Sequence, residues 1–147
     1  MIKMPLTLSF TLVAVSISLA GGTRESSNSD ENYDAVFRGV SQTKPVIINS
    51  RVEFYTPSFL FWKLHERVGE WEFELIASES WLNEVKSGFV KAEFSDPMRI
   101  PSAQWWKPNQ ESFDAFSLPF SSHSSSHMFI QKNPKADSGI HIFMQRH

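Results

Sequence analysis

The residues best suited to metal or acid–base chemistry are histidines, and four of the five lie in the last quarter of the chain. His123 and His127 are four positions apart, a spacing that lets two imidazoles bind one metal ion from a helix. The residues between them are three serines, which disfavour a helix, and no glutamate follows His123 as a zinc-peptidase motif requires. We therefore expect no metal site, with His123 and His127 as weak candidates.

Motifs for covalent catalysis and for nucleotide binding are absent from the sequence. It has no cysteine, no Gly-x-Ser-x-Gly turn and no glycine-rich phosphate loop. Glu70, Glu72 and Glu74 alternate, and paired carboxylates can serve glycoside hydrolysis. Alternating glutamates are nevertheless typical of the solvent-exposed side of a strand. We interpret them as that exposed side, and we expect neither enzymatic activity nor a cofactor.

The most distinctive short motif is Trp105-Trp106-Lys107-Pro108. Adjacent residues of an extended segment point to opposite sides, so one indole can enter the core while the other stays at the surface. A surface tryptophan beside Lys107 could stack on a sugar ring or on a partner's side chain. The alternative is that both rings fill the end of a sheet. Trp105, Trp106 and Lys107 are therefore the ligand-binding candidates of the sequence.

Composition restricts the remaining classes of function. A chain of 147 residues suggests one domain. A hydrophobic share of 41% and a charged share of 20% are ordinary for a globular protein and exclude wholesale disorder. The net charge of −2, without a block of like charge, lacks the electrostatic footprint of a nucleic-acid-binding protein. We therefore expect no nucleic-acid partner.

Residues 1–22 have the pattern of a secretory signal peptide. Lys3 supplies the positive charge, residues 6–19 form an apolar stretch, and small residues precede Gly21, where we place the cleavage site. The alternative is an uncleaved N-terminal membrane anchor, although the apolar stretch is shorter than the ~20 residues that span a bilayer. Gly22 stands where a bacterial lipoprotein carries its lipidated cysteine, so we reject lipidation.

The sequence has no cysteine and no Asn-x-Ser/Thr sequon, two features that together favour a bacterial source. An exported domain without disulfides depends on its own core, which fits a bacterial periplasm. We expect a periplasmic or secreted protein without stable membrane insertion after cleavage.

The elements that position these residues begin after the signal peptide. Residues 23–32 are polar and without periodicity, and we expect a flexible lead-in to a single globular domain at 33–147. Apolar residues of 33–40 have the spacing of one helical face, with Asn32 or Asp30 as the N-cap.

Further elements follow along the domain. Residues 46–48 have strand character. Ser78 or Ser80 is expected to cap a short helix at 81–86, and 89–94 continues in an extended or helical form.

The central stretch 51–88 is rich in aromatic side chains, and its strand at 70–77 alternates between apolar and acidic residues. Two structures are open for 58–68. Capping residues at both ends favour a helix, whereas aromatic residues favour a hairpin of 59–67 with 70–77. We adopt the hairpin, because an isolated amphipathic strand needs a partner.

In the C-terminal third, we expect a short helix at 109–116 and a serine- and histidine-rich loop at 121–127. The clearest element is a hairpin of 127–131 with 140–145, joined by turn-forming residues. Its self-consistent register pairs Met128 with Met144, Phe129 with Phe143, Ile130 with Ile142, and His127 with Gln145.

These elements predict an α+β domain: a small antiparallel sheet of about four or five strands, with two or three short helices on one face. By exclusion, the expected function is that of a non-catalytic binding or interaction protein of the bacterial cell envelope, with a protein or glycan partner. A carbohydrate- or peptidoglycan-binding module using Trp105 or Trp106 is the first alternative, and a histidine-based metal-dependent hydrolase is the second.

Signal cleavage gives the first testable prediction. Exported protein should begin at Gly21, because signal peptidase selects the small residues that precede it. N-terminal sequencing of the exported material measures this directly. Retention of Met1 would instead establish the uncleaved anchor.

Overall fold

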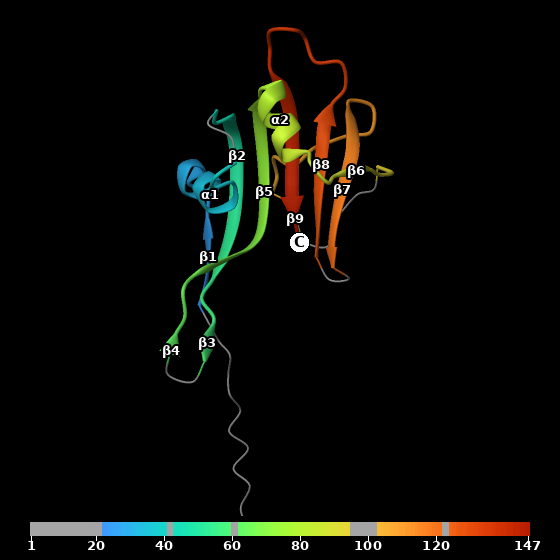
Figure 1. Cartoon of the computed structure of the whole chain (residues 1–147). Helices are drawn as coiled ribbons and strands as arrows, with labels where there is room; N and C mark the ends of the chain where they lie inside the picture. Colours follow the sequence, from blue (N-terminus) through green and yellow to red (C-terminus); the bar gives the residue numbers. More distant parts are fainter. Residues whose placement is uncertain (1–21, 41–42, 60–61, 95–102, 122–123) are drawn as a thin grey trace, which may run out of the picture.

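The structure is a computed structural model that describes residues 22–40, 43–59, 62–94, 103–121 and 124–147. One antiparallel sheet of seven strands dominates it, with two short helices packed on the sheet (Figure 1). From edge to edge the strands are β1 (Thr23–Ser26), β2 (Val46–Tyr55), β5 (Arg67–Ala77), β9 (Ile140–Arg146), β8 (Ser124–Gln131), β7 (Phe113–Ser121) and β6 (Val90–Lys91). The helices are α1 (Ser29–Val36) and α2 (Glu79–Val85). The protein consists mostly of β-strands and is α+β only in the broad sense. Its sheet is larger than the four or five strands expected.

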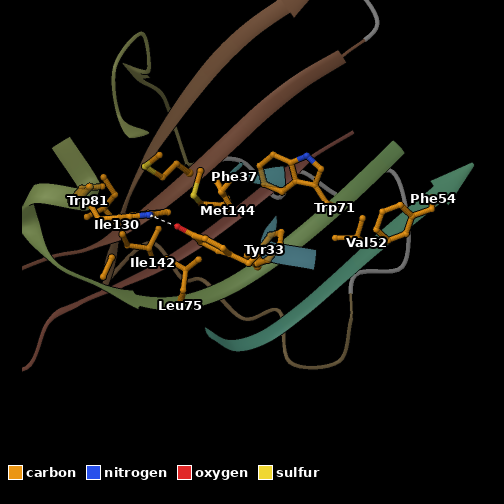
Figure 2. Close-up of a cluster of buried hydrophobic side chains, with 14 residues drawn as sticks. Tyr33, Phe37, Val52, Phe54, Trp71, Leu75, Trp81, Ile130, Ile142 and Met144 are labelled. Atoms are coloured by element: carbon orange, nitrogen blue, oxygen red, sulfur yellow. Dashed lines mark hydrogen bonds between the residues drawn. The ribbon is translucent and has the colours of Figure 1, made fainter. Parts of the chain in front are cut away.

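A first core lies between the two helices and one face of the sheet (Figure 2). Alternate residues of β5 enter it, among them Trp71 and Phe73, because successive side chains of a strand point to opposite faces. Phe37, the C-cap residue of α1, contacts the rings of Trp71, Phe73 and Trp81 at centroid distances of 5.8, 5.1 and 5.5 Å. Such aromatic pairs stabilise a core by about 0.5–1.5 kcal/mol each beyond their buried area.

One hydrogen bond inside this core joins the two helices. Nε1 of Trp81 donates to the hydroxyl oxygen of Tyr33 at 3.0 Å (Figure 2). Both side chains are buried, so each polar group depends on the other for its hydrogen bond. The bond fixes α1 relative to α2 across 48 positions of sequence.

The N-terminal part of the domain corrects two expectations. Residues 23–32, expected as a flexible lead-in, form β1 and the first half of α1. The N-cap is Asn28, whose Oδ1 accepts from the backbone N–H groups of Asp30 and Glu31. Asn32 is not the N-cap because its buried Nδ2 donates to Ser26 O and to the Ser50 hydroxyl, which ties α1 to β1 and β2.

The central stretch corrects a third expectation. The strand at 70–77 is confirmed and begins earlier, at Arg67, but its partners are β2 and β9. Neither structure expected for 58–68 is present: β3 (Ser58–Phe59) pairs with β4 (Trp62–Lys63) in a separate two-stranded sheet. β2 is the better partner because its ten residues place buried side chains on the core side, at Ser50, Val52 and Phe54.

The structure also differs from the expectation in the region before the C-terminal hairpin. Residues expected as a helix at 109–116 and a loop at 121–127 belong largely to β7 and β8, which pair with each other. The helical signal at Asn109 is local: its Oδ1 accepts from Ser112 N, and its backbone oxygen accepts from Phe113 N. That single turn ends where β7 begins. Serines of β8 alternate sides like any strand residues, and Ser126 is buried.

The two elements with the clearest local signals are confirmed. Strands β8 and β9 pair in the predicted register: Met128 with Met144, Phe129 with Phe143, Ile130 with Ile142, and His127 with Gln145. Helix α2 is capped by Ser78, whose hydroxyl accepts from Trp81 N at 3.2 Å, and Gly88 follows it at a φ of 86°.

Tyr33→Phe should destabilise the fold by about 1–3 kcal/mol, because it leaves the buried Trp81 N–H without an acceptor. Urea unfolding followed by near-UV circular dichroism measures this. Tyr55→Phe, at a more exposed ring, is the matched control and should change stability by less than about 0.5 kcal/mol. Equal losses in both variants would contradict a specific role for the hydrogen bond.

Candidate functional site

The second face of the sheet carries polar side chains in a row that crosses five strands. Neighbouring strands contribute one residue each, directly opposite one another in register: Arg51, Glu72, Gln145, His127 and Ser117. Since side chains alternate along each strand, these residues lie on the face opposite to the first core. We call this set the polar row.

Glu72 corrects the expectation that the alternating glutamates of β5 face solvent, because it is only 3% exposed. Its Oε2 accepts a hydrogen bond from Ala103 N at 3.3 Å and lies 3.8 Å from Nη1 of Arg51. Arg51 in turn contacts Glu25 Oε2 at 2.9 Å. The chain around Ala103 and Trp106 packs on this face of the sheet. The side of β5 that carries the glutamates is therefore partly covered, although its alternating pattern indicates an exposed side.

Among the described residues, Oε1 of Glu72 and both Oε1 and Nε2 of Gln145 are buried without a hydrogen-bond partner. Gln145 has no exposed surface. A cavity of about 10 Å³ lies beside Glu72, lined also by Arg51, Glu53, Glu70, Trp71 and His147. Each unpartnered buried polar group costs about 1–3 kcal/mol.

A second polar contact lies one step along β5. Oε1 of Glu74 is 2.9 Å from Nε2 of His141, and its Oε2 accepts from Nδ2 of Asn49 at 2.6 Å. The His141 ring also packs against Phe113 and Phe143, with centroids 5.5 and 4.9 Å apart. These contacts fix the orientation of the imidazole and link β2, β5 and β9 across the second face.

An aromatic cluster occupies the rest of this face. Its buried members are Trp106, Phe113, Ala115, Phe129 and Phe143, and Phe94 and Trp105 pack against them. The ring of Trp106 lies 5.9 Å from that of Phe129 and 5.4 Å from that of Phe143. We call this set the second aromatic cluster.

The structure separates the three ligand-binding candidates. Trp106 is 7% exposed and belongs to the second aromatic cluster, so its ring faces are not open to a ligand. Trp105 is partly exposed, with its ring 6.2 Å from that of Trp106, and Lys107 is exposed. Adjacent indoles therefore have different environments, and only Trp105 and Lys107 present surface for binding.

An open hollow of about 430 Å³ adjoins the second aromatic cluster, a volume within the range of small-ligand sites. Phe94 and Phe113 belong to both the cluster and the hollow. Around them the hollow is lined by Lys91, Ala92, Glu93, Gln110, Asp114, Ala115 and Lys132. We call it the β7 hollow. Both signs of charge and two aromatic rings therefore meet in one concave surface.

The histidine candidates do not come together with other metal ligands in what the structure describes. His123 lies outside the described residues. Nε2 of His127 is 2.9 Å from the Ser125 hydroxyl, and burial together with the charge of His147 lowers the pKa of His127 below its ordinary value of 6.5. Within the described ranges, no group of three His, Asp or Glu side chains is placed to hold one metal ion.

Comparisons with known proteins return no match: no family model, no curated protein and no solved structure is significantly similar to this chain. In the part of the chain that the structure describes, no helix is long and apolar enough to cross a membrane.

The polar row could not be predicted from the sequence, for a physical reason. Its members come from five strands, and only the register places them in line. The available signal was the pairing of His127 with Gln145 in the predicted hairpin. Burial of Glu72 could not be read from β5, because it depends on a segment that begins near Ala103, thirty-one positions away.

The pKa of His127 predicts how stability depends on pH. Because the folded state lowers this pKa, the unfolded chain binds the proton more readily, and stability should fall as the pH drops below 6.5 towards the folded-state pKa. His127→Gln should reduce this loss, as measured by thermal unfolding between about pH 7.5 and pH 5. His65→Gln, at an exposed position, is the control and should keep the wild-type slope. An unchanged slope in His127→Gln would contradict the assignment.

Proposed function

We propose that the protein is an exported, non-catalytic binding protein of the bacterial cell envelope. Export is supported by residues 1–22, whose charge, apolar stretch and small residues have the pattern of a signal peptide. A bacterial envelope is supported by an exported chain without cysteine. A binding role agrees with the lack of any nucleophile or phosphate-binding motif in the sequence.

The observation that carries the proposal is the β7 hollow. Concave surfaces are the usual form of a binding site. The lining of this one is more polar than apolar, and the partly exposed Phe94 supplies its aromatic surface, since Phe113 is buried. Lys91 lies 3.6 Å from Asp114, and Lys132 donates to Gln110 O at 2.7 Å, so both lysines are held at the rim.

The chemistry of the hollow favours a partner with both apolar rings or sugar faces and charged groups. Aromatic side chains pack on sugar rings and on apolar side chains, while lysine and aspartate bind carboxylates and amines. A peptidoglycan fragment offers a sugar and a charged peptide in one molecule. The probe of choice is therefore a soluble peptidoglycan fragment that carries its stem peptide.

A carbohydrate-binding module that uses Trp105 is the second candidate. Trp105 retains exposed surface next to Lys107, as such a module requires. With Trp106 buried, a platform of two adjacent indoles is not available, so this candidate has a single exposed ring.

Titration of isotope-labelled protein with this fragment, followed by nuclear magnetic resonance, tests the proposal. Backbone signals of Ala92, Asp114 and Ala115 should shift, because these residues line the hollow. Lys132→Gln should weaken binding about fivefold, since it removes one rim charge worth about 1 kcal/mol. Lys135→Gln, in the turn between β8 and β9, is the matched control and should bind like wild type.

Other outcomes discriminate among the candidates. Equal binding of a peptide-free oligosaccharide, with the largest shifts at Trp105, would support the carbohydrate-binding module. Turnover of the fragment would contradict a non-catalytic role. Shifts that avoid the hollow and are unaffected by Lys132→Gln would contradict the β7 hollow as the site.

A further inference from the structure

The hairpin of β3 and β4 exposes an unusual amount of apolar surface. Trp62 is 74% exposed and Leu64 is 46% exposed, and Tyr55 at the base of the hairpin is also exposed. Large apolar side chains gathered at one projecting point of a soluble protein mark an interaction surface. We call Trp62 and Leu64 the hairpin tip.

The hairpin stands apart from the rest of the fold. β3 and β4 pair only with each other in the described chain, and Figure 1 shows them beyond the end of the seven-stranded sheet. From Thr56 to Phe59, an extended chain reaches about 10 Å. The hairpin tip therefore projects from the sheet instead of covering a part of it.

Exposed ion pairs and one backbone hydrogen bond connect the base of the hairpin to β1 and α1. Both Nε and Nη2 of Arg24 contact Glu66, at 2.8 and 2.6 Å, and Nη2 also contacts Glu31 at 2.8 Å. The hydrogen bond from Arg24 lowers the pKa of Glu66, which keeps this carboxylate charged. Leu64 N donates to Pro57 O at 3.0 Å across the hairpin.

The N-terminal apolar segment joins the domain at the same end. Thr23 of β1 pairs with Tyr55, and Thr56 N donates to Gly22 O at 3.0 Å. Gly22 directly follows residues 1–21, which include the apolar stretch at 6–19. The point where a membrane-directed segment would leave the domain is therefore adjacent to the hairpin tip.

From these observations we propose that the hairpin tip docks on a lipid bilayer surface by shallow insertion of Trp62 and Leu64. Tryptophan is enriched at the headgroup level of membranes, where its ring is buried and its N–H stays hydrated. A stable protein interface buries about 800 Å² per partner, and the two described side chains of the hairpin tip do not supply this area by themselves. Shallow insertion needs no such area.

The charges near the tip indicate which force dominates. Arg67 is exposed at the base, whereas the positive charge of Arg24 is already shared between Glu31 and Glu66. The sequence has no polybasic block. Lys63 stands between Trp62 and Leu64 in the sequence and adds one cation at the tip. Insertion should therefore be mainly apolar, with a small dependence on salt and on anionic headgroups.

Fluorescence quenching tests the proposal on the full chain as the cell exports it, whether or not the signal peptide is retained. The membrane is a vesicle of phosphatidylethanolamine and phosphatidylglycerol with brominated acyl chains, which quench an inserted indole. Wild type should show quenching that Trp62→Phe lacks, because Trp71, Trp81 and Trp106 are buried in the protein. Trp105→Phe is the matched control and should retain the quenching.

A second pair of variants separates insertion from misfolding. Trp62→Ser with Leu64→Ser should retain the wild-type unfolding midpoint, because both side chains are exposed, yet lose the quenching. If the signal peptide has been removed, the same variant should also lower vesicle partitioning about tenfold or more.

Two results would overturn the proposal that the hairpin tip docks on a bilayer. Equal quenching in wild type and Trp62→Phe would overturn the proposal. So would a wild-type dimer in lipid-free solution that Trp62→Ser converts to a monomer without any lipid quenching, since the tip would then bind a second copy. Either result leaves the β7 hollow untouched, because the proposed function rests on different residues.

Discussion

The pairing of β5 with β2 on one side and β9 on the other is the constraint on which the rest of the structure depends. β5 is eleven residues long and faces two interiors at once. Its apolar side chains complete the first core under the helices. Its glutamates lie on the second face, where Ala103 and Arg51 contact Glu72. A central strand with covered faces must bury whatever it carries, acids included.

This constraint explains which features the sequence predicts and which it does not. Elements whose signals are local are predicted: the cap of Ser78, the strand beginning near Glu70, and the β8–β9 register, where matching apolar pairs leave one consistent alignment. Partner choice is not local. Residues 59–67 have the aromatic pattern of a hairpin arm, yet β5 pairs with β2, and no local signal in either segment decides between these two partners. Burial of Trp106 and partial exposure of Trp105 likewise depend on which face the segment covers.

The polar row raises the question of why a small fold retains buried groups that cost stability. An ion pair such as Arg51 with Glu72 is seldom net stabilising once desolvation is counted. It does, however, make alternative registers costly. A slip of β8 by one residue against β9 would turn His127 towards the first core, which is lined mainly by apolar side chains, and would leave Gln145 on the second face without its neighbour in the row. The row thus favours a single alignment of five strands at the expense of some stability.

The register also fixes how the two proposed binding features are oriented. The base of the projecting hairpin lies where Tyr55 pairs with Arg67, at the first residue of β5. The β7 hollow contains Asp114, which pairs with Ile130, then through Ile142 reaches Leu75, eight residues further along β5. At ~3.3 Å per residue the two levels are about 26 Å apart. Docking of the tip on a bilayer would therefore hold the hollow away from the lipid, facing the space in which a peptidoglycan partner lies. An arrangement of this kind needs no contact between the two features, because the sheet alone sets the distance.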